Sequence, residues 1–181
     1  MQIKTKDVVN IGLYVALTLV LDFIKESIPF LNLPMGGSIN IALIPVVIAS
    51  LHLGVVKGLF VAFLWLVFGT LFGWNGTYIN FMQWALDYIV PTMIMGCAGM
   101  FYKNRKMLGA IGGVTLTMVI RTVSILVSGA YFWFPEGEIA GSTLAWVGSF
   151  QYNLPYSIAT LVVLLIVTPI IISRFKKQIS K

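Results

Sequence analysis

The chain has few of the residues on which catalysis and metal binding usually depend. It contains one cysteine, Cys97, and one histidine, His52, and only 10% of its 181 residues are charged. A single cysteine excludes an intramolecular disulfide, and without a Cys/His cluster the sequence offers no metal site. No Gly-x4-Gly-Lys-Ser/Thr phosphate loop is present, which excludes ATP hydrolysis by that route.

Intramembrane proteolysis is disfavoured by similar absences. No histidine accompanies a serine within an apolar stretch, so a serine dyad lacks its base. No acidic pair suggests aspartyl chemistry. We therefore expect a protein that is not an enzyme and that carries no cofactor.

Apolar residues, in contrast, make up 59% of the chain, which is too many for a soluble domain. They form six stretches, at about residues 8–24, 38–51, 58–72, 79–101, 108–130 and 144–173. A membrane-spanning helix needs about 20 such residues, so six spans leave room only for short loops. The sequence predicts an all-α membrane protein, a six-transmembrane-helix bundle in one domain over residues 1–181. The lack of an internal repeat disfavours an inverted-repeat secondary transporter.

Basic residues lie almost entirely on one side of these stretches. They are Lys4, Lys6, Lys57, Lys103, Arg105, Lys106, Arg174, Lys176, Lys177 and Lys181. The loops on the other side hold Lys25 with the acidic Glu26, Glu136 and Glu138. Because cytoplasmic loops collect Lys and Arg, both termini are predicted to be cytoplasmic. The net charge of +6 then reflects topology and contact with anionic lipids, rather than nucleic acid binding.

The segment between the first two stretches, residues 25–37, is unusually apolar for a solvated loop. Pro29, Pro34 and the pair Gly36-Gly37 mark it as irregular. Irregular backbone at membrane depth is tolerated where protein covers it. We therefore expect an apolar lid loop that lies back over the bundle.

Three polar residues fall at about the same depth inside separate spans. Asp87, Arg121 and Asn153 each lie eight or nine residues from the outer end of their span, or about 12–13 Å at helical rise. Polar groups within a membrane are costly and are functional candidates by default. Their common depth predicts a binding site in the outer half of the membrane.

Further hydrogen-bonding and aromatic side chains share helical faces with these three or lie just above them. Those that we take as candidate ligand contacts are Gln83, Trp84, Ser128, Tyr131, Trp133 and Trp146. Such a mixture suits a small polar heteroaromatic molecule. Structural roles remain open: Asp87 and Arg121 can neutralise each other, Asn153 can bridge helices, and Tyr131 and Trp133 fit an interfacial aromatic belt.

Several short motifs follow one another along the six stretches. They are PMGGS at 34–38, IP at 44–45, GVVKG at 54–58, QWALDY at 83–88, Arg121, SG at 128–129, FW at 132–133, PEG at 135–137 and YN at 152–153. In this order and spacing they resemble the substrate-binding S components of energy-coupling-factor (ECF) vitamin transporters, most closely the thiamine-specific branch.

The resemblance implies a six-helix subunit that captures thiamine or a related pyrimidine vitamin with high affinity and joins a transmembrane T component and two ATPases. It also implies docking through small residues on the first helix, here Gly12 and Ala16, whose spacing independently predicts a close helix contact. Ordinary packing within the bundle is the alternative for this pair. The alternative for the whole chain is a structural or assembly subunit, without ligand transport, that an Asp87–Arg121 pair holds together.

The resemblance further implies roles for individual residues. Asp87, with Tyr88 beside it, would meet the cationic or aminopyrimidine part of the ligand, Trp133 would stack on it, and Asn153 would hydrogen-bond it. Three positions depart from the family pattern, which has a histidine where this chain has Ile125, a tyrosine where it has Gly148, and an aromatic residue in the lid loop where it has Leu33. Either other side chains compensate or the cargo is a relative of thiamine; the candidates for compensation are Gln151, Tyr131 and Trp146.

Overall fold

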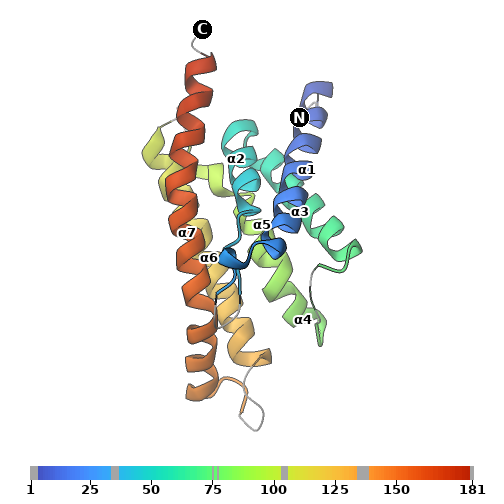
Figure 1. The fold of residues 1–181 in the computed structure, drawn as a ribbon, viewed down its shortest axis with the longest axis vertical. Helices are drawn as coiled ribbons and strands as arrows, with labels where there is room; N and C mark the ends of the chain where they lie inside the picture. The colour runs from blue at the N-terminus through green and yellow to red at the C-terminus, as the bar shows by residue number, and fades with distance from the viewer. Residues whose placement is uncertain are drawn as a thin grey trace.

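The structure is a computed structural model, and it describes residues 4–33, 37–74, 76, 78–102, 106–133 and 139–179, with only the backbone of residues 26 and 175–179. This part of the chain folds into helices joined by short connections (Figure 1). The elements are α1 (Thr5–Ser27), η1 (Pro29–Leu31), α2 (Leu43–Leu53), α3 (Val55–Leu71), α4 (Phe81–Trp84), η2 (Ala85–Ile89), α5 (Val90–Met95), η3 (Ala98–Phe101), α6 (Met107–Phe132) and α7 (Thr143–Ile179).

The predicted all-α, six-helix bundle is confirmed, with the run from α4 to η3 acting as one interrupted helix. Four segments are long and apolar enough to cross a membrane: Thr5–Lys25, Phe81–Phe101, Met107–Phe132 and Thr143–Arg174. The apolar helices α2 and α3 are shorter. The two ends of the chain lie at the same end of the bundle (Figure 1).

Helix α2 begins later than the sequence predicted, at Leu43 instead of residue 38. The residues before it are extended and pair with the end of the preceding segment. Ser38 forms an isolated bridge with Asn32, and the Ile39 N–H donates to the Leu31 carbonyl at 2.8 Å. These contacts give backbone N–H and C=O groups hydrogen-bond partners outside a helix. The first residues of the predicted second span are therefore not helical.

The predicted lid loop, residues 25–37, ends just before this segment, and both contact α7. The Asn40 N–H donates to Thr160 Oγ1 at 3.0 Å. Gly37 has a φ of +74° and sits so close to the Tyr156 ring that a Cβ atom would overlap it. Phe30, in contrast, is 87% exposed. Residues 34–36, which contain part of the PMGGS motif, lie outside the described residues.

The fourth predicted span is broken by a π-helical turn that the apolar pattern did not reveal. Pro91 has no N–H and its ring would clash with the Asp87 carbonyl of a regular α-helix. The preceding turn widens to η2, in which the Val90 N–H donates to the Ala85 carbonyl. In this i→i+5 register the Leu86 carbonyl would require a donor at position 91, and the Ser124 hydroxyl donates to it instead, at 2.7 Å.

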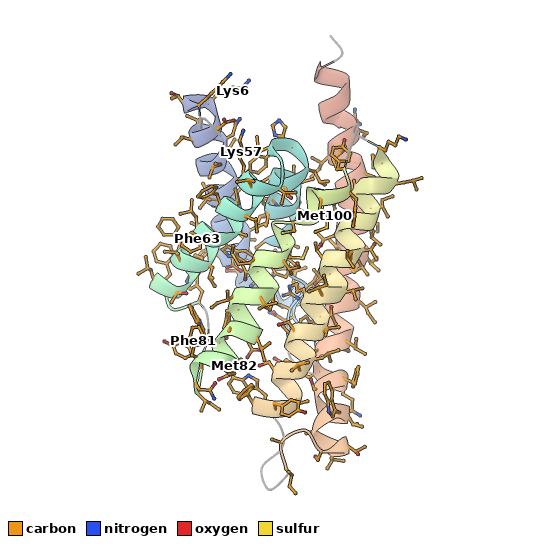
Figure 2. All side chains as sticks on the ribbon, turned by 180° about the vertical axis from the view of Figure 1, so that it is seen from behind. Lys6, Lys57, Phe63, Phe81, Met82 and Met100 are labelled. Atoms are coloured by element: carbon orange, nitrogen blue, oxygen red, sulfur yellow. The ribbon has the colours of Figure 1, made fainter. Side chains whose placement is uncertain are left out.

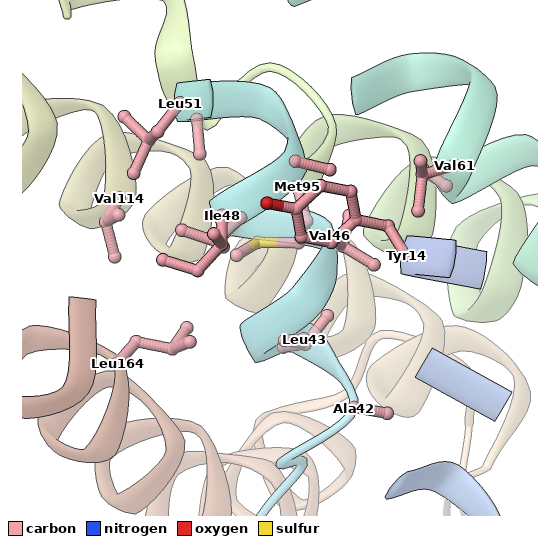
Figure 3. Packing of buried hydrophobic residues seen from close by; sticks show 14 of the residues in the cluster. Tyr14, Ala42, Leu43, Val46, Ile48, Leu51, Val61, Met95, Val114 and Leu164 are labelled. Carbon is pink, nitrogen blue, oxygen red and sulfur yellow. The ribbon is translucent and has the colours of Figure 1, made fainter. Parts of the chain in front are cut away.

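Helix α2 forms the centre of the apolar core (Figure 3). It is buried at Leu43 and from Pro45 to Leu51, and side chains from α1, α3, α5, α6 and α7 surround it. Near its C-terminal end Ser50 binds the η3 region twice: its hydroxyl donates to the Gly96 carbonyl at 2.5 Å and accepts from the Gly99 N–H at 2.9 Å. Small residues allow this close approach of backbones.

Charged residues mark the end of the bundle that holds the termini. Lys57 and Asp7 form an ion pair of 2.6 Å there, which joins α3 to α1. Figure 2 shows Lys6 and Lys57 at this end and Phe81 and Met82 toward the opposite one. The C-terminal end of α6 and the N-terminal end of α7 also lie at the opposite end (Figure 1).

Candidate functional site

A cavity of about 670 Å³ opens between η2, α6 and α7, in the half of the bundle away from the termini. Its volume falls within the range of small-molecule pockets. Its lining residues are Asp87, Tyr88, Arg121, Ile125, Gly129, Trp133, Gly148, Ser149, Tyr152, Asn153 and Tyr156. Asp87, Arg121 and Asn153, which the depth count grouped, therefore meet at one hollow.

Asp87 is fixed by two donors that leave half of its carboxylate available. Its Oδ2 accepts from Gln83 Nε2 at 3.2 Å and from Trp133 Nε1 at 2.8 Å. Its Oδ1 accepts no hydrogen bond from the residues that the structure describes. A carboxylate held by two donors is pre-oriented, and the open oxygen can receive a ligand's positive charge or N–H group.

Gln83 acts behind Asp87 and lies outside the cavity wall. Its Oε1 accepts from the Ile79 N–H at 2.5 Å, and its backbone N–H donates at 2.9 Å to Oδ1 of Asn80, the residue that caps the start of α4. The side chain is fully buried. Gln83 therefore orients the carboxylate rather than lining the cavity.

Asn153 is held on α7 by its own helical neighbours. Its Nδ2 donates to the Ser149 carbonyl at 3.0 Å, and its Oδ1 accepts from the Tyr156 hydroxyl at 2.5 Å. The Ser149 hydroxyl in turn donates to the Leu126 carbonyl of α6 at 2.8 Å. A Cβ atom on Gly129 would overlap Ser149 Oγ, so only glycine permits this close contact between α6 and α7.

The structure contradicts the alternative in which Asp87 and Arg121 neutralise each other as a structural pair. Within the described part of the chain no ion pair joins them, and Arg121 Nη1 is buried without a hydrogen-bond partner. Asp87 is instead oriented by Gln83 and Trp133. The two charges line the same cavity as separate groups.

Four other candidate residues, like Gln83, lie away from the cavity wall. Trp84 precedes the π-turn, and its ring packs against Tyr78 and Phe81, each with centroids 6.1 Å apart. Ser128 is fully buried, one residue and about 100° around α6 from Gly129. The last two, Tyr131 and Trp146, pack edge to face on each other at 6.2 Å.

Sequence reasoning did not assign ligand contacts to Tyr152, Tyr156 and Ser149, although they line the cavity. Ser149, Tyr152, Asn153 and Tyr156 fall at i, i+3, i+4 and i+7, which is one face of a helix. That spacing around Asn153 was the signal that could have found them. Tyr152 and Tyr156 pack edge to face at 6.0 Å.

Two of the three departures from the family pattern also lie in the cavity wall, and Leu33 is not among the lining residues. Ile125 and Gly148 line it directly, so the missing imidazole and phenol would have faced this space. None of the three residues expected to compensate is among the residues that line the cavity. They are Gln151, Tyr131 and Trp146. The tyrosines at 152 and 156 supply polar aromatic surface there instead.

Gly12 and Ala16 lie far from this cavity, on the outer face of α1. Both are exposed, and no atom lies within 4 Å of the position of a Cβ on Gly12. This contradicts the alternative that the pair serves packing within the bundle. The motif at 135–137 and the acidic residues Glu136 and Glu138 lie outside the described residues.

The apolar helical bundle, and a cavity whose wall combines apolar surface with charged and polar side chains, define a multi-pass membrane protein that can enclose a small molecule. The chain belongs to the thiamine transporter family, whose model matches residues 8–180. It is similar to the thiamine transporter ThiT of Bacillus subtilis (strain 168), with 27% identity over 177 residues that cover 88% of this chain and 86% of the relative.

Two solved structures share the fold. ThiT from Listeria monocytogenes superposes with a TM-score of 0.74 and 21% identity, over 94% of this chain and 95% of the other. The S component of a bacterial ECF transporter superposes with a TM-score of 0.68 and 20% identity, over 97% and 98% of the two chains. At sequence identities of 20–21%, the structural similarity establishes a shared fold.

Proposed function

We propose that this chain is a thiamine-binding S component, which captures the vitamin in the cavity between η2, α6 and α7. The observation that carries the proposal is the open carboxylate oxygen of Asp87, held in a cavity beside Trp133 and Asn153. Membership of the thiamine transporter family supports the choice of ligand. A related pyrimidine vitamin shares the same chemistry and belongs in the same test.

Each wall of the cavity offers one kind of contact that such a ligand needs. Asp87 Oδ1 receives the cationic ring or an exocyclic amine, and the attraction is strengthened by the surrounding low dielectric. Trp133, which is 51% exposed, offers a ring face for stacking on the ligand at the cavity mouth. Asn153 and the tyrosines Tyr88 and Tyr152 provide polar atoms that fix orientation.

Trp133 also couples the two functions of the site. Its Nε1 holds the Asp87 carboxylate, so the stacking residue and the charged residue are positioned together. A ligand that stacks on this indole meets a carboxylate already turned toward the cavity. Such pre-organisation reduces the ordering cost of binding.

The proposal extends to the partners and to the orientation in the membrane. S components deliver their cargo through a T component and two ATPases, and we assign the exposed Gly12–Ala16 face of α1 to the T component. The ion pair between Lys57 and Asp7 lies at the end that carries the termini. By the distribution of basic residues that end is cytoplasmic, so the cavity lies toward the outside.

A purely structural or assembly role loses its main support. That alternative rested on an Asp87–Arg121 pair that holds the bundle together, and no such pair joins the two among the described residues. Asp87 keeps an oxygen open to the cavity, which a structural ion pair would not do.

Calorimetric titration of the purified protein with thiamine tests the proposal. Wild-type protein should bind in the nanomolar to micromolar range. Trp133→Ala should weaken binding about tenfold or more, because stacking on an aromatic ring contributes about 1–3 kcal/mol per heteroaromatic base. Trp74→Ala removes a tryptophan outside the cavity, which packs against Phe72 at 5.1 Å, and should change affinity by less than about twofold.

Lack of heat for thiamine and for its pyrimidine relatives, with wild-type protein shown to be folded, would contradict the proposal. Equal losses of thiamine affinity in Trp133→Ala and Trp74→Ala would show that the ligand binds outside this cavity.

The proposed orientation is tested by labelling with an impermeant thiol reagent in a Cys97→Ser background. Lys106→Cys introduces a thiol at an exposed site just before α6 and should react only in opened cells. Ile139→Cys, at a position that is 79% exposed before α7, should react in intact cells. The reverse pattern would contradict cytoplasmic termini.

A further inference from the structure

A second pocket with charged walls lies between the C-terminal ends of α1 and α3, on the other side of the bundle from α7 (Figure 1). Its volume is about 300 Å³, and its lining residues are Asp22, Phe23, Lys25 and Trp74. None of these residues lines the cavity between η2, α6 and α7. The volume is at the lower end of the range for small-molecule sites, so the pocket suits a small polar group.

The base of this pocket is a carboxylate that the proposed vitamin site does not use. Asp22 lies within the first membrane span and is only 7% exposed. Its Oδ2 accepts from Trp65 Nε1 of α3 at 2.8 Å, and its Oδ1 lies 2.5 Å from Lys25 Nζ in an ion pair. This ion pair does not have hydrogen-bond geometry, and Oδ1 accepts no hydrogen bond from the described residues. A buried carboxylate oxygen of this kind favours a ligand that donates an N–H group.

The two charges of the pocket indicate a ligand with charges of both signs. Asp22 and Lys25 together are neutral, and their side chains are only 8% and 15% exposed. A ligand with a single charge would leave an excess charge in this mostly buried place, which is costly. A zwitterion with an ammonium group and a phosphate avoids that cost. It extends the ion pair to an alternating row, in which phosphate, Lys25, Asp22 and ammonium follow one another.

The rim of the pocket is aromatic and continues into the apolar surface of α1. The rings of Phe23 and Trp74 lie 6.3 Å apart, and an ammonium group is attracted to the face of such rings. Val20 is 53% exposed and Phe23 63%, and their spacing of three residues places them on one face of the helix. This face offers apolar surface to acyl chains beside the pocket. The C-terminal end of α1 is the end that we assign to the outside, at the level of lipid headgroups.

We propose that this pocket binds the phosphoethanolamine headgroup of an outer-leaflet phospholipid. The ammonium group donates to Asp22 Oδ1, and the phosphate contacts Lys25. A primary ammonium fits better than the quaternary group of choline, because only the primary group has N–H bonds to donate. The inference goes beyond the proposed function and does not depend on which vitamin is bound, since the two sites share no lining residue.

Native mass spectrometry of the full chain in detergent tests this lipid site. The protein is titrated with phosphatidylethanolamine, phosphatidylcholine and phosphatidylglycerol that carry identical acyl chains. Wild-type protein should bind the ethanolamine lipid at least about tenfold more tightly than the other two, as expected for a hydrogen bond to a charged group. Asp22→Asn should reduce this preference to less than about threefold. Lys6→Met, at an exposed site near the other end of α1, should leave the preference unchanged.

Two further arms locate the site and identify the source of the headgroup. Lys25→Met should weaken binding of all three lipids about threefold or more, because each carries a phosphate and a partly exposed ion pair is lost. Glycerophosphoethanolamine, which has the headgroup without acyl chains, should compete with the ethanolamine lipid only at much higher concentration.

Four results would overturn the proposal. They are equal binding of the three lipids by wild-type protein, an unchanged preference in Asp22→Asn, unchanged affinities in Lys25→Met, and competition by glycerophosphoethanolamine at the concentration of the lipid itself. The last result would assign the pocket to a soluble aminophosphate. Should Asp22→Asn not fold, the wild-type preference and Lys25→Met decide the question.

Discussion

The two halves of the bundle are built from similar apolar sequence but differ in how they treat polar groups. Around α2, side chains of α1, α3 and α5 form a buried apolar core, and Ser50 has its hydroxyl bonded to the Gly96 carbonyl. Between η2, α6 and α7, Asp87 and Arg121 line a hollow of about 670 Å³, and Arg121 Nη1 has no hydrogen-bond partner among the described residues. The half around α2 stabilises the fold, and the half between η2, α6 and α7 leaves polar groups available to bind a ligand.

The π-helical turn η2 is the local feature that distinguishes the cavity half from the packed half. It places Asp87 on a widened turn, and Ser124 of α6 compensates for the carbonyl that Pro91 cannot serve. π-turns inside α-helices are frequently found at functional sites. The difference between the halves predicts that changes in one should affect binding and changes in the other should affect stability.

The largest effect should come from Asp87→Asn, which removes the cavity's negative charge and keeps the shape of the side chain. We expect thiamine affinity to fall about 100-fold or more, since truncating one partner of a buried charge pair costs about 2–5 kcal/mol. Calorimetry measures the change. Asp7→Asn, which breaks the ion pair with Lys57 at the far end, is the matched control and should alter affinity less than about twofold. Unchanged binding in Asp87→Asn would remove this carboxylate from the site.

A smaller effect, on stability rather than affinity, should follow from Gly58→Ala in the packed half. The added Cβ would lie 2.6 Å from the Gly96 carbonyl oxygen and 2.6 Å from Ser50 Cβ, and overpacking of this kind costs about 1–3 kcal/mol. Thermal unfolding in detergent should show a lower midpoint. Gly112→Ala, where no atom lies within 4 Å of the new Cβ, should not lower it. Equal midpoints for the two variants would mean that the packed half tolerates more than its geometry implies.

The smallest effect on the isolated protein should come from Gly12→Leu on the exposed face of α1. Because no atom lies within 4 Å of the Cβ position, unfolding and thiamine binding should change by less than about 0.5 kcal/mol. Association with the T component should weaken, and co-purification of the assembled transporter measures it. Val9→Leu, on the same helix at a residue that is 65% exposed, is the control. Normal assembly of Gly12→Leu would place the docking surface elsewhere.

Much of the fold could be predicted because long apolar runs leave few alternatives to membrane helices. The ends of α1, α6 and α7 fall within a few residues of the expected bounds, apart from the longer C-terminal end of α7. The late start of α2 was not predictable from its composition, because it depends on pairing between Ser38 and Asn32. The break in the fourth span could have been suspected from Pro91, but its form depends on the donor from Ser124.

The depth of the candidate site in the membrane was predictable from the sequence. Which side chains of each helix face the cavity was harder to predict, because that depends on helical phase. Counting residues from the span ends grouped Asp87, Arg121 and Asn153, because all three spans cross the same layer. Extending the face of the fourth span to Trp84 failed, since the π-turn adds a residue and shifts the helical phase between positions 84 and 87. Of the two donors to Asp87, Gln83 lies four residues earlier on the same helical face, so the spacing anticipated it. Trp133 is brought to Asp87 by tertiary structure, which no spacing in the sequence encodes.

The most direct measurement is an experimental structure of the protein with saturating thiamine. The account predicts ligand density between η2, α6 and α7, with the indole of Trp133 against a ring of the vitamin and Asp87 Oδ1 within hydrogen-bonding distance of the ligand. Density for thiamine at another place, or a cavity filled only by rearranged side chains at saturating ligand, would contradict it.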